Sequence, residues 1–589
     1  MNQFNILACL AMILLVAACK TEPTTEAINF TRTDNTVIAR LEDDVKNIMP
    51  PLASSNYESQ VFEQIYNYLI SFDPRTNLFA PELVKEIPDI EVLEANDQGK
   101  YAFTFEILDE AVWADGSPVT AEDWLFTLKV VFNPLVDAVR YRAILDGEFN
   151  NLTIDPDNPK RFTMYFDQQS ISGLETLTNT LPVIPAYLCD PEGLMKSYSL
   201  TDLLDGDKAE QLAAEGGNLQ TFADQFNSPE FLQDFSKLSG SGPYELVAWE
   251  TGQQVRLRKK TDWWGEGTSK ETHPTLEAYP TEIVYKPITN PVTALAALKS
   301  EEIDVTYRIP PTDFEVLKED SVAGERYNLN GVSSFACYFL SVNTRRPKLA
   351  EKEVRQALAY ALDVDEILDK VYLNYGERIT SPVHPSQPYY NKDLEVITRN
   401  VDKAKTLLSQ AGWQDSNNNG IVDKEIEGEL VELSIEFLYS SGRETTQNAC
   451  LLMQNQAKEA GIDLQLTPSP GNVLFGNWRS GNYDLVSAGS TITPTWNPRQ
   501  SWHTEGANRS GFGNADTDAL IDDIIVTLDM EERIKKYNEL QSIIYDEQPY
   551  IFLFAPVTSV AVHKRFDFKP FGMFPCYQPR YFKLKDEFM

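Results

Sequence analysis

Strand-like and helix-like segments alternate through the second half of the chain, and this alternation constrains the fold more than any other feature. The strand-like segments are short and apolar, whereas the helix-like segments have apolar residues three or four positions apart. Because strands that alternate with helices form a largely buried sheet covered by helices, we predict an α/β fold. A chain of 589 residues is too long for a single core, so we expect about two to four domains. The predicted strands include 303–307, 335–342, 433–438 and 483–486, and the predicted helices include 292–299, 404–411, 446–460 and 533–548.

The N-terminal residues resemble a bacterial lipoprotein signal. An apolar run, 6–18, ends in the sequence VAAC, which closes with Cys19. The run is too short to span a bilayer but suits the core of a signal peptide. We therefore expect 1–18 to be removed, lipid to be attached to Cys19, and 19–27 to form a tether that anchors the protein to a membrane. The pattern departs from the usual one in that Met1 to Asn5 contain no Lys or Arg. An ordinary secretory signal is the alternative, and both signals place the mature protein outside the cytoplasm.

Charge and composition exclude several classes of function. The net charge of −37 would repel a polyanion, so we expect no nucleic-acid partner. The four histidines form no cluster, and we find no Gly-x-Ser-x-Gly, His-Glu-x-x-His or phosphate-loop motif, so we expect no enzyme and no metalloenzyme. Four cysteines remain in the mature chain without a Cys-x-x-Cys motif, and the sequence does not pair them. They are Cys189, Cys337, Cys450 and Cys576.

Six runs spread along the chain together resemble the peptide- and nickel-type solute-binding lipoproteins of ABC importers. This resemblance implies a monomeric receptor that captures a short peptide or peptide-like solute and delivers it to an ABC permease. The alternatives are the same fold binding a metal chelate or a sugar, and a secreted hydrolase. The runs are 113–124 (WADGSPVTAEDW), 240–244 (GSGPY), 298–304 (LKSEEID), 354–363 (VRQALAYALD), 404–413 (AKTLLSQAGW) and 537–546 (YNELQSIIYD).

The resemblance also implies a periplasmic-binding-protein-like fold with two lobes, a two-strand hinge and a subdomain inserted in lobe one. The ligand would be enclosed between the lobes. By analogy, the two hinge crossings would lie near 287–288 and near 554–556, and both contain proline. The implied boundaries are 28–66, 188–285 and 555–589 for lobe one, 67–187 for the subdomain, and 286–554 for lobe two.

The ligand segment implied by the resemblance follows the predicted strand 483–486. In peptide binders of this family, an aspartate there pairs with the ligand's α-amino group. Here the stretch 488–498 (AGSTITPTWNP) contains no Asp or Glu, and a threonine occupies the expected place. The alternatives are that this stretch is a plain loop, that Asp44 is only an exposed strand-end carboxylate, and that Tyr244 serves packing alone. The expected ligand contacts are Asp44, Tyr244, Gly489, Ser490, Thr491, Thr493, Thr495 and Trp496.

A second candidate site is the segment 415–423 (DSNNNGIVD). Side chains with oxygen atoms stand at alternate positions before Gly420, which resembles the start of a calcium loop. The glutamate usual at position twelve is replaced by Ile426, so we expect modest affinity for Ca²⁺. An Asn- and Gly-rich surface turn is the alternative. The candidate ligands are Asp415, Asn417, Asn419 and Asp423.

Overall fold

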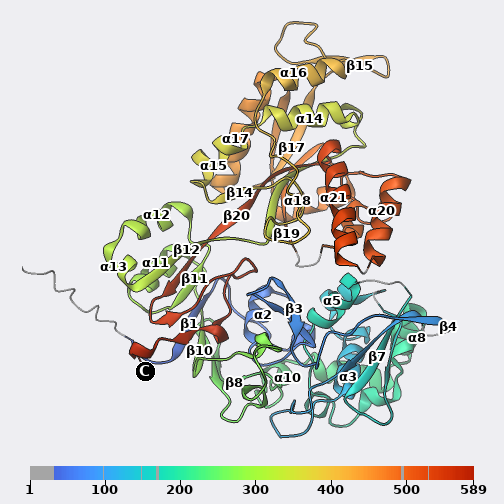
Figure 1. Ribbon diagram of the computed structural model, residues 1–589, viewed down its shortest axis with the longest axis vertical. Coiled ribbons are helices and arrows are strands. Elements are labelled where there is room, and N and C mark those ends of the chain that lie inside the picture. The colour runs from blue at the N-terminus through green and yellow to red at the C-terminus, as the bar shows by residue number, and fades with distance from the viewer. Residues whose placement is uncertain are drawn as a thin grey trace, which may run out of the picture.

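The computed structural model describes residues 32–96, 99–147, 149–167, 171–492, 496–527 and 529–588. It has two lobes, one above the other in Figure 1, joined by strands of a single twelve-stranded sheet. The mixed α/β fold predicted from the alternating pattern is therefore confirmed. Cys19 lies outside the described residues. Within the part of the chain that is described, no helix has the length and apolar character needed to cross a membrane.

Lobe one is built on a mixed sheet whose central strand is the first of the chain. This strand, β1, pairs in parallel with β10, and Val37, Ala39 and Leu41 on it are buried in the main core. The turn around Gly252 joins β8 and β9 in a hairpin, which extends the sheet beyond β10. In sheet order the strands are β11 (Val305–Tyr307), β1 (Thr36–Leu41), β10 (Glu282–Pro287), β9 (Gln254–Lys259) and β8 (Tyr244–Glu250).

Lobe two has its own part of the sheet and its own cores. Helices pack on the faces of this sheet, as the sequence period predicted. The strands in order are β18 (Asp463–Ser469), β17 (Ser434–Ser440), β19 (Leu485–Thr491) and β13 (Ala336–Val342). The main helices are α14 (Lys352–Ala361), α15 (Val364–Tyr372), α16 (Val401–Gln410), α17 (Glu444–Glu459), α18 (Gly471–Ser480), α20 (Ala515–Val526) and α21 (Met530–Glu547).

One long strand, β20 (Tyr550–His563), runs through both lobes. Its first half pairs with β13 of lobe two, and its second half pairs with β11 and with β12 (Tyr327–Ser333). The chain passes from β12 to β13 through Ser334 and Phe335, which form the other crossing. Strands β11 and β12 both pair within the lobe-one part of the sheet. The chain therefore first passes from lobe one to lobe two at 334–335, whereas the resemblance implied that it does so near 287–288.

A four-stranded antiparallel sheet with helix α3 (Ala121–Phe132) forms a separate layer beside lobe one. The run 113–124 lies here and has a structural role. Thr120 and Asp123 form a capping box at the start of α3, in which the buried Asp123 carboxylate accepts the Thr120 amide at 2.9 Å. The same carboxylate accepts the Trp113 indole N–H at 3.3 Å. The strands in order are β4 (Glu91–Asn96), β5 (Gly99–Glu106), β7 (Arg161–Phe166) and β6 (Asn151–Ile154).

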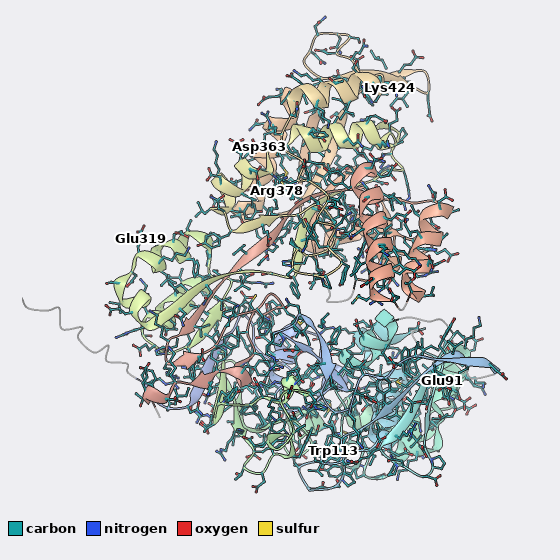
Figure 2. All side chains as sticks on the ribbon, viewed as in Figure 1. Glu91, Trp113, Glu319, Asp363, Arg378 and Lys424 are labelled. Carbon is teal, nitrogen blue, oxygen red and sulfur yellow. The ribbon has the colours of Figure 1, made fainter. Side chains whose placement is uncertain are left out.

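The runs that carry the resemblance therefore include residues that begin or end helices, in both lobes. Figure 2 labels Trp113 in the lower lobe and Asp363 in the upper lobe. Asp363 ends the α14 segment and caps α15, because its carboxylate accepts the Glu366 amide at 2.9 Å. The four cysteines of the described chain are free and buried, in different parts of the fold: Cys189, Cys337, Cys450 and Cys576.

Candidate functional site

A cavity of about 840 Å³ lies between the two lobes. One wall comes from helices of the lower lobe in Figure 1, which is lobe one with the layer beside it. The other comes from β13, β19, β20 and the segment after β19 in the upper lobe, which is lobe two. The C-terminal segment 573–575 completes the lining. Since the walls stand on opposite sides of the hinge strands, a change of the angle between the lobes would open or close this cavity.

The end of strand β19 reaches into the cavity. Ser490 and Thr491 are exposed residues that line it, and the Ser490 hydroxyl lies 3.2 Å from the Cys337 sulfur. Gly489 instead packs beneath a neighbouring strand: a Cβ atom there would lie 2.9 Å from the Tyr338 ring. Gly489 therefore allows β13 and β19 to approach. Thr493 and Thr495, the other expected contacts in this stretch, lie outside the described residues.

Aromatic side chains form much of the upper wall. Trp496 lines the cavity and stacks on Tyr537, whose hydroxyl donates a hydrogen bond to the Trp496 carbonyl at 2.5 Å. Trp502 and Tyr550 also line it, with ring centroids 4.7 Å apart. Rings held in this way offer a rigid apolar surface for a ligand. None of the described upper-lobe residues in the lining carries a charge.

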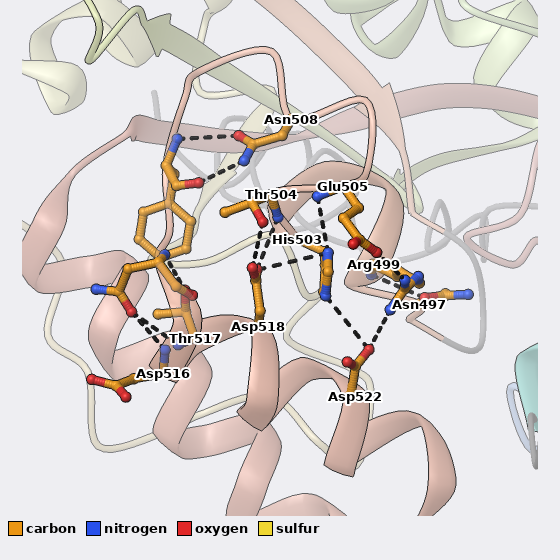
Figure 3. Close-up of polar contacts among 12 residues, drawn as sticks. Asn497, Arg499, His503, Thr504, Glu505, Asn508, Asp516, Thr517, Asp518 and Asp522 are labelled. Carbon is orange, nitrogen blue, oxygen red and sulfur yellow. Dashed lines mark hydrogen bonds and ion pairs between the residues drawn. The ribbon is translucent and has the colours of Figure 1, made fainter.

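A cluster of ion pairs holds the short helix α19 (Arg499–Trp502), which carries Trp502 (Figure 3). Arg499 pairs with Asp522 on α20 and with Glu505. The His503 ring lies between two carboxylates of α20, 3.7 Å from Asp518 and 3.6 Å from Asp522. These contacts tie the segment after β19 to α20, and so they position the aromatic wall.

The lower wall is polar and carries all the charge among the described lining residues. Helix α2 (Asn56–Phe62) and helix α5 (Ile171–Asn179) face the cavity with amide and hydroxyl groups. Burial raises the pKa of Tyr141 to about 12, so its phenol is neutral at pH 7. The charged residues of this wall are Glu63, Arg140 and Glu175.

Two expected ligand contacts in lobe one, Asp44 and Tyr244, are not among the residues that line this cavity. Asp44 joins the end of β1 to the β8–β9 turn, because its carboxylate accepts the amides of Val45 (2.9 Å) and Gly252 (2.8 Å). Tyr244 is fully buried and its hydroxyl donates to the Pro280 carbonyl at 2.9 Å. For Tyr244 this burial matches the packing alternative, whereas Asp44 is half-buried and bonded to the turn instead of being an exposed strand-end carboxylate.

A second cavity, of about 910 Å³, lies beside the first. A narrow space of about 110 Å³ shares Glu63, Met573 and Phe574 with the first cavity, and Pro74 and Phe571 with the second. The segment 571–575 therefore stands between the two larger cavities. No periodicity or motif in the sequence predicted this second space.

A serine, a histidine and a glutamate meet at the second cavity. The Ser333 hydroxyl donates to Glu377 at 2.6 Å and lies 3.0 Å from the His384 ring nitrogen Nε2. Burial lowers the pKa of His384, so its ring is neutral at pH 7. The carboxylate accepts its hydrogen bond from the serine, whereas a serine nucleophile is activated by a histidine that the carboxylate orients.

Comparison with known proteins decides the family. Residues 48–512 match the family model "Bacterial extracellular solute-binding proteins, family 5 Middle", which is well over half of the chain. The chain belongs to family 5 of the bacterial extracellular solute-binding proteins. Proteins of this family are transport receptors and not enzymes.

Individual relatives of this family 5 protein are distant in sequence. It is 27% identical over 333 residues to the oligopeptide-binding protein AppA of Bacillus subtilis, across 55% of this chain and 58% of AppA, less than two thirds of that relative. It is 22% identical over 483 residues to the probable D,D-dipeptide-binding periplasmic protein DdpA of Escherichia coli, across 80% of this chain and 79% of DdpA. The structure of B. subtilis AppA in complex with a nonapeptide superposes with a TM-score of 0.65 at 20% identity, covering 94% of this chain and 99% of AppA. That likeness confirms the fold implied by the resemblance.

The candidate calcium loop of this family 5 protein is closed by its own hydrogen bonds. Asp415 accepts the amides of Asn419 and Gly420, both at 3.0 Å, and the buried carboxylate of Asp423 accepts the amide (3.0 Å) and hydroxyl (2.7 Å) of Ser416. The Asn417 side-chain oxygen also accepts the Asn419 amide, at 3.0 Å. Across the described chain, no group of three or more His, Cys, Asp or Glu side chains could hold a metal ion. These contacts give the loop hydrogen-bond partners of its own, as the surface-turn alternative requires.

We therefore expect calcium to leave the stability of the protein unchanged. Thermal melts of the wild type in millimolar calcium and in chelator should have the same midpoint, because a ligand that binds only the folded state would raise it. Asp415→Ala should lower the midpoint equally in both, since it removes the acceptor of two backbone amides. A calcium-dependent rise that is lost in Asp415→Ala would restore the calcium site.

Proposed function

We propose that this chain is a lipid-anchored, extracytoplasmic receptor that captures a short peptide or peptide-like solute and delivers it to an ABC permease. The observation that carries the proposal is the cavity of about 840 Å³ between the lobes. Cavities of about 300–1,000 Å³ are typical of sites that enclose small ligands. We propose that Ser490, Thr491 and Trp496 contact the ligand from the upper lobe.

The chemistry of the two walls suits a peptide. Amide side chains of the lower wall, such as Asn56 and Gln60, can donate to and accept from peptide bonds. The rings of Trp496, Trp502 and Tyr550 can hold apolar side chains of varied size. The names of two relatives, an oligopeptide-binding and a probable D,D-dipeptide-binding protein, point to the same class of ligand.

Delivery would depend on closure about the strands β20 and β12–β13. A ligand that contacts both walls binds the closed form better than the open form, and so shifts the population toward closure. The permease would then recognise the closed form. The small space between the cavities, beside Phe571 and Met573, would let a longer peptide extend toward the second cavity.

Native mass spectrometry of freshly purified protein tests this proposal. We expect a fraction of the protein to carry extra mass that fragments as a peptide. A bound metal chelate or a sugar would overturn the peptide assignment and leave the receptor role in place. Binding of peptides that is unchanged when the cavity is blocked would overturn the assignment of the site.

We expect lipid on Cys19, which lies in the VAAC sequence after the apolar run. Cys19→Ser should release the protein from the membrane fraction, because no thiol remains to carry the lipid. Cys9→Ser is the matched control, since this cysteine lies in the segment to be removed, and it should fractionate as the wild type does. Membrane association of Cys19→Ser equal to that of the wild type would show that the anchor is elsewhere.

A further inference from the structure

Glu63 is a carboxylate at the cavity whose charge the protein itself only partly compensates. It ends helix α2 and lines both the cavity of about 840 Å³ between the lobes and the narrow space beside that cavity. Tyr68 donates its hydroxyl to one carboxylate oxygen at 3.4 Å, and Gln578 donates its amide to the other at 3.1 Å. Both donors are neutral.

The cation near Glu63 is committed to another carboxylate. Arg580 pairs with the buried Glu82 at 3.4 Å, and toward Glu63 it donates only to the main-chain carbonyl, at 3.5 Å. Among the ion pairs of the described residues, none includes the Glu63 side chain. Glu63 therefore faces the cavity with hydrogen bonds from neutral groups, and the charge of Arg580 lowers its pKa by less than burial raises it.

Two physical effects make this arrangement costly in the absence of a ligand. Burial raises the pKa of Glu63, which shows that its anion is poorly solvated. The C-terminal end of a helix carries partial negative charge and favours a cation, yet the residue at the end of α2 is an acid. A cation arriving with the ligand would remove both penalties.

The rest of the cavity directs such a cation to this wall. The described upper-lobe lining is neutral, and the other charged lining residues are Arg140 and Glu175 on the lower wall. Arg140 is exposed, donates to Asn56 at 3.1 Å and lies over the Tyr141 ring. Acidic groups thus outnumber basic ones at the cavity, and both acids belong to the lower lobe.

We propose that Glu63 binds the primary ammonium group of the ligand. The ammonium would sit at the junction of the large cavity and the narrow space, with its charge paired to the carboxylate and the remainder of the ligand lying against the aromatic wall. This inference rests on the proposed function, because it names the group by which a peptide-like solute is oriented. Charge-assisted hydrogen bonds are the strongest that such a ligand can form, so Glu63 sets specificity.

The test compares a casein digest of short peptides with the same digest after acetylation, which removes primary ammonium groups. Bound peptides are counted by native mass spectrometry for the wild type, Glu63→Gln and the control Glu42→Gln. Glu42 is a lobe-one carboxylate that pairs with Arg308 at 3.2 Å and is not among the residues lining the cavities. We expect wild type and Glu42→Gln to prefer unacetylated peptides about tenfold or more, and Glu63→Gln to lose that preference.

Stability without peptide provides a second readout. Because folding raises the pKa of Glu63, its contribution to stability is present below the unfolded pKa and is lost as pH rises through the folded pKa. Glu63→Gln does not titrate, so it should melt above the wild type at neutral pH and lose that advantage at acidic pH. A Glu63→Gln that melts below the wild type at neutral pH would show that the protein already compensates the charge, and would overturn the inference.

The outcomes separate this inference from the peptide assignment. Peptides bound without preference for a free ammonium, or a preference that survives Glu63→Gln, would overturn the role of Glu63 and leave peptide binding in place. If no peptide binds, glycinamide and its N-acetyl form are compared in thermal melts. Stabilisation by glycinamide alone, lost in Glu63→Gln, would support the ammonium site and contradict the peptide assignment; no stabilisation would contradict both.

Discussion

Asp304→Ala is expected to destabilise lobe one by about 3–5 kcal/mol, the cost of leaving a buried charge without its partner. Asp304 and Arg565 are both fully buried, and their side chains meet at 2.9 Å. The same carboxylate oxygen accepts the Ile38 amide at 2.7 Å. The substitution would therefore strand the Arg565 guanidinium at the point where β1, β11 and the end of β20 join.

The matched control is Asp34, because its partner Arg32 also contacts Asp304, at 3.0 Å. Asp34 pairs with Arg32 at 3.0 Å and is half exposed, and exposed pairs contribute about 0–1 kcal/mol. Asp34→Ala should therefore have little effect in urea unfolding followed by circular dichroism. Equal effects of Asp34→Ala and Asp304→Ala would contradict the assignment of Asp304 as the buried centre of this junction.

Thr491→Trp is expected to weaken ligand binding by about 100-fold, about 2.8 kcal/mol, by placing an indole where the ligand would lie. Thr491 ends β19, is exposed and lines the cavity. The large side chain would project between the walls and oppose closure. It should cost little stability, because the position has no buried packing to disrupt.

Val473→Trp is the control for Thr491→Trp. Val473 is an exposed residue of α18 and is not among those that line the cavities. Calorimetric titration with the peptide identified by mass spectrometry should show unchanged affinity in Val473→Trp and a loss in Thr491→Trp. Unchanged affinity in both variants would mean that the ligand does not occupy the space beside β19.

Local patterns predicted much of the fold because they report on neighbours in the chain. The strands predicted at 335–342 and 433–438 and the helices predicted at 404–411 and 446–460 all depend on residues within a few positions of one another, and they are present as β13, β17, α16 and α17. The hinge crossing at 334–335 depends on which strands pair with β20, over 200 residues away. The residue pattern of β11 and β12 does not say which distant strand each of them pairs with.

The candidate site was predicted on one wall only. Ser490, Thr491 and Trp496 follow a strand that the sequence identified, so their neighbourhood was accessible to pattern analysis. Glu63 ends a short helix whose position opposite β19 is set by the packing of the two lobes. The stretch 489–497 holds no carboxylate, and the one that we propose as the ammonium partner stands on the other lobe.

A crystal structure of the protein with the ligand that it retains on purification tests the central claim most directly. We expect electron density for a peptide in the cavity between the lobes, in contact with Thr491 and Trp496 on one side and with its ammonium group beside Glu63 on the other. Ligand density confined to another surface, with this cavity filled only by water, would contradict the account.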